Sequence, residues 1–181
     1  MAPRKKNALK TTVSPQSRLN HVDGTGKAAM VNVGQKAETR RIAVASAAVR
    51  MSKETLRMIA QNSGNKGDVL AVSRIAALSA LKRTADLIPL CHPVRVVGSE
   101  LRLELDLKLP GVRVQCTVEA FDRTGVEMEA MFGASVAALT IYDMVKGVER
   151  GVTIESVALE QKSGGRSGLW NRPSSPPKPR S

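Results

Sequence analysis

The chain has 181 residues and a formal net charge of +12; 42% of its residues are hydrophobic and 24% are charged. This length fits a single domain, and the balance excludes a wholly disordered or collagen-like chain. Only 2% of the residues are aromatic. Because proteins that bind single-stranded nucleic acid usually stack bases on aromatic side chains, this scarcity argues against that class.

The positive charge is concentrated at the two ends of the chain. Residues 1–22 contain five Lys or Arg and residues 163–181 contain four, with no acidic residue in either segment, so only +3 remains for the residues between them. A mildly basic body suits a phosphorylated small molecule better than a long polyanion. We therefore expect no nucleic-acid partner.

The composition along the chain predicts three segments. Residues 1–18 form a basic tail that is either disordered or a transit segment, residues 19–170 form one domain, and residues 171–181 form a disordered tail rich in Pro and Ser. No apolar run reaches the ~18 residues needed to cross a bilayer, and the two cysteines form no CxxC pair. We expect a cytoplasmic protein with no membrane contact and no structural metal, or a mitochondrial matrix protein if the first segment is a transit peptide.

The first elements predicted in chain order are a strand and two helices. Residues 40–51 are rich in small and β-branched side chains, which favours a strand. Ser52 is a suitable N-cap for a short helix through Gln61. Asp68 caps a second helix, in which apolar residues recur every three or four positions until Pro89 ends the element.

A hairpin, a long helix and a last strand follow. Leucines alternate with charged residues from Leu101 to Leu107, Pro110-Gly111 turns the chain, and residues 112–120 alternate again. The sequence then predicts a helix over residues 127–148 and a strand over residues 152–159. This mixture predicts an α+β two-layer sandwich, with an antiparallel sheet and helices packed on one face.

Two polar segments flank the second helix. Lys66 directly precedes its start, where backbone amides and the helix dipole favour an anion, although a surface lysine there is usually only solvated. Cys91-His92 is fixed between Pro89 and Pro93, which restrict the backbone. A rigid imidazole there can transfer protons near neutral pH; the alternative is a buried His bonded to a backbone carbonyl. Cys91 fits packing better than nucleophilic attack.

The long helix carries two further pairs of charged residues. Glu127 and Glu129 share one side if the backbone is extended and diverge in a helix, whose start favours Glu in any case. Asp143 and Lys146 lie three residues apart, either as a structural ion pair or as catalytic groups. Glu129 and Asp143 are ~21 Å apart along a continuous helix. They can serve one pocket only if the helix breaks near Gly133 or a second chain contributes one of them.

Five motifs, KGDV, LIPLCHPV, TGVEMEA, AALTIYDM and KSGGRSG, follow one another within residues 19–170. In their order and separation they resemble the molybdenum cofactor biosynthesis protein C family, the cyclic pyranopterin monophosphate synthases. The resemblance implies a ferredoxin-like subunit, a hexamer built as a trimer of dimers, and active sites at the dimer interface. It also implies a lyase that converts 3′,8-cyclo-7,8-dihydro-GTP, the product of an upstream radical S-adenosylmethionine GTP cyclase, to cyclic pyranopterin monophosphate and pyrophosphate.

The resemblance also assigns roles to individual residues. The catalytic residues correspond to Lys66, Asp143 and Lys146. The residues implied to bind the substrate are Lys36, Arg41, Lys82, Leu90, Cys91, His92, Glu127, Met128, Glu129 and Lys162. No cofactor is required, although Mg²⁺ could accompany the triphosphate. The family pattern is not kept at Asn32, Arg123, Phe132-Gly133 and Val145, so the alternative is a catalytically impaired paralogue that binds a nucleotide or a partner enzyme.

Overall fold

The computed structural model describes residues 26–64 and 67–174, and the chain divides into two units. Of the first unit, Met1–Asn32, residues 26–32 are described, and they lie outside the helices and strands. The second unit, Val33–Ser181, contains the helices and strands of the described chain. The predictions for residues 1–18 and for Lys66 lie outside the described residues.

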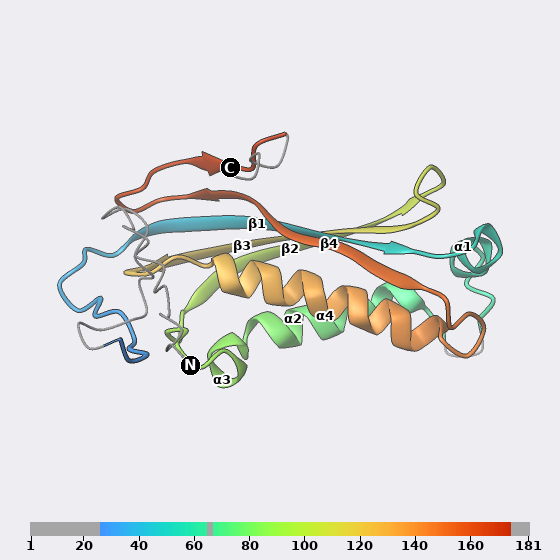
Figure 1. Ribbon diagram of the computed structural model, residues 1–181, viewed down its shortest axis with the longest axis horizontal. Coiled ribbons are helices and arrows are strands. Elements are labelled where there is room, and N and C mark those ends of the chain that lie inside the picture. The colour runs from blue at the N-terminus through green and yellow to red at the C-terminus, as the bar shows by residue number, and fades with distance from the viewer. Residues whose placement is uncertain (1–25, 65–66, 175–181) are drawn as a thin grey trace, which may run out of the picture. The chain divides into compact units, whose positions relative to one another are not determined.

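The strands of the second unit form one antiparallel sheet (Figure 1). Their order across the sheet is β2-β3-β1-β4-β5, and each neighbouring pair is antiparallel. The strands are β1 (Thr39–Arg50), β2 (Val96–Asp106), β3 (Gly111–Asp122), β4 (Thr153–Ser163) and β5 (Trp170–Asn171). The predicted hairpin of two alternating strands is the pair β2 and β3.

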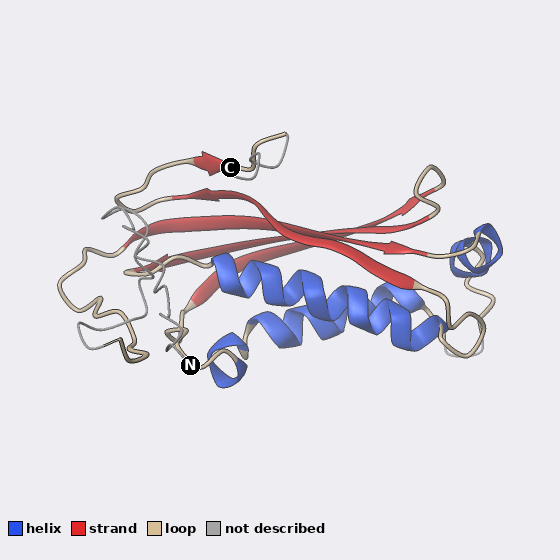
Figure 2. Cartoon of the chain, viewed as in Figure 1, coloured by secondary structure: helices blue, strands red, loops and turns tan. Residues whose placement is uncertain are grey.

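Two long helices cover one face of this sheet (Figure 2). Helix α4 contacts β1, β3 and β4, and α2 packs beside α4. The helices are α1 (Lys53–Ala60), α2 (Val69–Leu81), α3 (Thr84–Leu87) and α4 (Glu127–Val145). The chain is an α+β sandwich consistent with the ferredoxin-like fold, which confirms the predicted fold class.

The core lies between the helices and the sheet because each strand presents alternate residues to that side. Along β3, the even-numbered residues from Val112 to Ala120 are buried, whereas Arg113 and Gln115 are exposed on the other face. The residues of α4 that face the sheet are mainly small. They include the fully buried residues Ala130, Ala134, Ala137 and Ala138. A core built without large aromatic residues therefore depends on a close approach of helix to sheet.

Gly133 makes the closest part of this approach. Helix α4 continues without a break through Gly133. Of the two alternatives for Glu129 and Asp143, a helix break near Gly133 is therefore wrong. A Cβ atom at position 133 would lie 2.8 Å from Cys116 Sγ and 3.6 Å from Leu81 Cβ. The glycine thus allows the α4 backbone to pack against both β3 and α2, and this departure from the family pattern is accommodated in the core.

Two boundaries differ from the predictions for local reasons. The second helix ends at Leu81 instead of Pro89, and the Thr84 hydroxyl donates to the Leu81 carbonyl where the separate helix α3 begins. Leu107 lies in the turn after β2, because the Asp106 carboxylate accepts the N–H groups of Lys108 and Leu109. Both ends are therefore set by side-chain bonds to the backbone, which compete with regular structure.

Three other boundaries shift by a few residues. Helix α4 ends at Val145, short of the predicted 148, and β4 extends to Ser163, beyond the predicted 159. Strand β5 includes Asn171, and Arg172 Nε donates to the Leu159 carbonyl at 2.8 Å. The structured part of the chain therefore continues past residue 170.

Helix α4 also has the length and hydropathy of a membrane span, and 44% of that stretch is buried inside the protein. Its buried residues face the sheet and include Ile141 and Val145. The apolar composition of α4 is therefore explained by its place in the core.

Gly133→Ala is expected to destabilise the fold by about 1–3 kcal/mol, the usual effect of an extra methyl group in a packed core. Urea unfolding measures this difference. Gly147→Ala is the control, because a Cβ there has no neighbour within 4 Å. Combining Gly133→Ala with Cys116→Ala removes the sulfur and should recover part of the loss. Equal stabilities of the Gly133 and Gly147 variants would contradict this packing account.

Candidate active site

Most of the predicted substrate-binding residues lie at one end of the sheet, which we call the site end. Strand β1 begins there and β3 and β4 end there, with Thr39 paired to Asp122 and Ile42 to Ser163. Helix α4 starts directly after β3, and Figure 1 shows its first turn at this end. The topology brings to the site end Lys36, Arg41, Leu90, Cys91, His92, Glu127, Met128, Glu129 and Lys162.

Glu127 and Lys162 form an ion pair between α4 and β4. Glu127 Oε1 lies 3.2 Å from Lys162 Nζ, and both side chains are about 30% exposed. The same ammonium group donates to Ser167 Oγ at 3.1 Å, in the KSGGRSG motif. An anion bound at the site end would therefore compete with the Glu127 carboxylate for the Lys162 ammonium group.

Glu129 is buried, although it lies only two residues after Glu127. The residue is 2% exposed, and its Oε1 lies 3.7 Å from Cys91 Sγ. Burial is the main cause that raises the pKa of Glu129, and the Glu127 and Asp122 carboxylates act in the same direction. Hydrogen bonds from its own backbone N–H and from Cys91 act against this rise. Burial is the main cause that raises the pKa of the Cys91 thiol to about 11. Cys91 is therefore a thiol at neutral pH, which disfavours nucleophilic attack.

Arg41 is held by backbone carbonyls at the site end. Its Nε donates to Asp122 O and its Nη2 donates to Arg123 O, both at 3.2 Å. A Cβ at Gly165, where φ is +68°, would lie 1.8 Å from Arg41 Nη1. Glycine tolerates this φ and leaves room for the guanidinium, so the KSGGRSG loop can pack directly against Arg41. This arrangement fixes the guanidinium, as recognition of a phosphate requires.

The remaining predicted residues surround these contacts. Leu90 and His92 are half-buried between α3 and β2, and Met128 is 37% exposed on the first turn of α4. Lys36 lies in the turn before β1, which Arg123 fixes by donating to Gly34 O at 3.1 Å. Lys82 is the exposed C-cap residue of α2.

Asp143 and Lys146, two of the predicted catalytic residues, lie at the opposite end of α4. Lys146 Nζ is 2.7 Å from Asp143 Oδ1, and both side chains are more than half exposed. The hydrogen bond from Lys146 to Asp143 raises the pKa of Lys146, so the ammonium group stays charged at neutral pH. Because α4 is continuous, ~21 Å separates Asp143 from Glu129. One chain therefore does not bring these two sets of residues together.

Three residues contribute to the site end without having been assigned a role from the sequence. Ser167 bonds Lys162, Arg123 fixes the turn at Gly34, and Asp122 lies beside both Arg41 and Glu129. Ser167 belongs to the KSGGRSG motif, and Arg123 departs from the family pattern. No motif in the sequence points to Asp122, because its role depends on how the end of β3 pairs with the start of β1.

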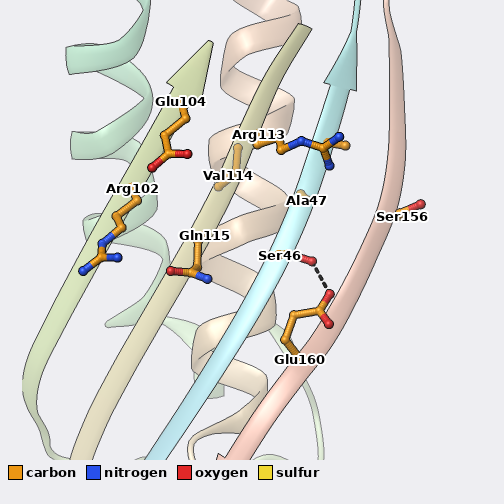
Figure 3. Close-up of a pocket in the computed structure, with 10 residues that line it drawn as sticks. Ser46, Ala47, Arg102, Glu104, Arg113, Val114, Gln115, Ser156 and Glu160 are labelled. Carbon is orange, nitrogen blue, oxygen red and sulfur yellow. Dashed lines mark hydrogen bonds between the residues drawn. The ribbon is translucent and has the colours of Figure 1, made fainter. Parts of the chain in front are cut away.

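A separate hollow of about 410 Å³ lies on the sheet face that points away from the helices (Figure 3). Its lining includes Arg102, Arg113 and Glu160, and Ser46 Oγ donates to Glu160 Oε1 at 2.5 Å. The two arginines already pair with Glu100 and Asp106. Among the predicted site residues that the structure describes, none lines this hollow, so it is distinct from the site end.

The fold and the charged groups at the site end define an α+β domain suited to an anionic small molecule, and comparison with known proteins identifies its family. The model of the MoaC family matches residues 30–165. Proteins named cyclic pyranopterin monophosphate synthase from Brucella ovis, Brucella melitensis and Brucella abortus are each 52% identical over 153 residues, covering 84% of this chain and 93% of each relative. The chain belongs to the MoaC family, which confirms the resemblance seen in its motifs.

Gly165→Ala should weaken the binding of pyrophosphate about tenfold, because the new Cβ displaces Arg41 and a hydrogen bond to a charged group contributes ~1.5 kcal/mol. Titration calorimetry measures the affinity. Gly168→Ala is a matched control, since Gly168 also has a positive φ but a Cβ there would have no neighbour within 4 Å. Similar affinities of the two variants would show that backbone strain, not Arg41, causes the effect.

Proposed function

We propose that the chain is a cyclic pyranopterin monophosphate synthase, a lyase of molybdenum cofactor biosynthesis. It converts 3′,8-cyclo-7,8-dihydro-GTP to cyclic pyranopterin monophosphate and releases pyrophosphate. The observation that carries this assignment is the 52% identity over 84% of the chain to relatives of that name. The match to the MoaC family over residues 30–165 supports it.

The site end offers the groups that such a reaction needs. Opening an imidazole ring and building a pterin requires several proton transfers, while forming the cyclic phosphate requires positive charge at the leaving pyrophosphate. Arg41 and Lys162 lie together with the KSGGRSG loop and suit the triphosphate. His92 and Glu127 lie at the same end and suit proton transfer near the base and ribose.

Of the proposed catalytic residues, Asp143 and Lys146 complete this site from a second subunit, and Lys66 lies outside the described residues. The length of α4 keeps Asp143 and Lys146 away from the site end of their own chain. Exposed apolar residues on the two long helices, Val72, Ile75 and Leu139, offer a surface for contact between subunits. We therefore propose a homo-oligomer with shared sites, built as a hexamer from three dimers.

The alternative is a catalytically impaired paralogue that binds a nucleotide or a partner enzyme. Two departures from the family pattern have structural explanations that do not disturb the site: Gly133 packs in the core, and Arg123 anchors the turn at Gly34. The chain also keeps Asp143 and Lys146 as a pair. These observations favour the active enzyme.

The proposed reaction also implies an upstream enzyme, a location in the cell and a cofactor requirement. A radical S-adenosylmethionine GTP cyclase would supply the substrate, and the bacterial origin of the relatives favours a cytoplasmic location over a mitochondrial one. Within residues 26–64 and 67–174, no three His, Cys, Asp or Glu side chains gather as metal ligands. We propose that the protein needs no cofactor of its own, while Mg²⁺ could enter with the triphosphate.

Incubation of the purified protein with 3′,8-cyclo-7,8-dihydro-GTP tests the assignment, with pyrophosphate and cyclic pyranopterin monophosphate as the measured products. Asp143→Asn should lower kcat at least about a hundredfold, as expected for a positioned proton-transfer group. Glu100→Gln is a matched control, because Glu100 and Arg102 form a similarly exposed ion pair away from the site. Product formation by neither the wild type nor the control would refute the assignment.

A further inference from the structure

The segment 88–94 carries His92, and within the described chain one hydrogen bond links it to α4. Cys91 N donates to Ile88 O at 3.0 Å, which shapes the segment itself. Within the described chain, the contact of Cys91 Sγ with Glu129 Oε1 at 3.7 Å is the one hydrogen bond from residues 88–94 to α4. This contact is therefore the polar link between the segment that carries His92 and the first turn of α4.

The number of available hydrogens at Cys91 constrains the protonation of Glu129. The sulfur lies 3.7 Å from Glu129 Oε1 and also 3.7 Å from the His92 carbonyl oxygen. A thiol has a single hydrogen, and a carbonyl oxygen can only accept. If the thiol donates to both oxygens, it must share its one hydrogen between them. Each contact has a hydrogen of its own if the Glu129 carboxyl is protonated and donates to the sulfur while the thiol donates to His92 O.

The surroundings of Glu129 favour this neutral carboxyl. Its Oε2 is buried and has no hydrogen-bond partner within the described residues. The charged groups that act on the pKa of Glu129 are the Glu127 and Asp122 carboxylates, and Lys162 pairs with Glu127 instead. The Arg41 guanidinium donates to backbone carbonyls of the neighbouring turn. A buried carboxylate without its own cation is unfavourable, which favours the protonated form of Glu129.

We propose that Cys91 and Glu129 form a buried, neutral, hydrogen-bonded pair, and that Cys91 is a positioning residue that holds His92 against the first turn of α4. The pair would fix His92 relative to Glu127, because Glu127 and Glu129 lie on the same first turn of α4. Its effect on catalysis rests on the proposed function of the site end, whereas the pair itself does not.

Two substitutions of Cys91 separate a hydrogen-bonding role from packing. Cys91→Ser keeps a side chain that donates and accepts, and Cys91→Ala does not. We expect Cys91→Ala to lower kcat/KM about tenfold or more and Cys91→Ser to restore most of that loss. Thermal unfolding of both variants checks that the fold is kept. Activity of Cys91→Ala equal to or above that of Cys91→Ser would overturn the proposal, since a packing role favours the apolar side chain.

Glu129→Gln tests the neutral pair without using turnover. Glu129 has an ordinary pKa near 4.5 when unfolded and a raised pKa when folded. As the pH rises above about 4.5, the unfolded chain releases this proton first, so the wild type loses stability until the pH passes the folded pKa. Gln does not titrate, and the stability of Glu129→Gln relative to the wild type should therefore increase over this range.

The two measurements fail independently. A pH-independent difference between Glu129→Gln and the wild type in urea unfolding, or one that increasingly favours the wild type, would overturn the neutral pair. Absence of turnover by the wild type would instead refute the proposed function, and the unfolding measurement would still decide whether Glu129 is neutral.

Discussion

Helix α4 packs so closely against the sheet that small residues must face it, and the placement of the charged groups depends on this contact. Gly133 lets the backbone approach Cys116 and Leu81, and fully buried alanines continue the contact along the helix. Helix α4 is therefore continuous, and its two ends carry different charged groups. Glu127 and Glu129 lie at its start, and Asp143 and Lys146 lie near its end. Close packing thus separates groups that one reaction would need together.

The first turn of α4 gives two nearby glutamates opposite environments. Glu127 is ion-paired with Lys162 and remains partly exposed, while Glu129 points into the protein beside Cys91. In a helix, residues i and i+2 point about 200° apart around the axis, so the different environments of Glu127 and Glu129 follow from the backbone geometry. Burial of a carboxyl without a cation is unfavourable for stability. Its presence is understandable if the contact with Cys91 orients the segment that carries His92.

Local signals in the sequence predicted most of the fold, because alternation and helix capping depend on neighbouring residues. Ser52 and Asp68 accept hydrogen bonds from Thr55 N and Ala71 N, as their positions before the helices predicted. The contacts of the site could not be predicted in the same way. Cys91 meets Glu129 across 38 residues, and Arg41 meets Asp122 across 81, so both contacts depend on how helices and strands pack. The family motifs grouped these residues without showing their geometry.

A second subunit must complete each active site if α4 keeps Glu127 and Asp143 apart, and mixed oligomers test this most directly. Glu127→Gln and Asp143→Asn should each be inactive alone. When equal amounts are reassembled, about a quarter of the sites should receive both intact residues, one from each chain, because the two sites of a symmetric dimer are related by exchange of the chains. Recovery of about a quarter of the wild-type activity is expected. No recovery in oligomers verified to be mixed would contradict a site shared between subunits.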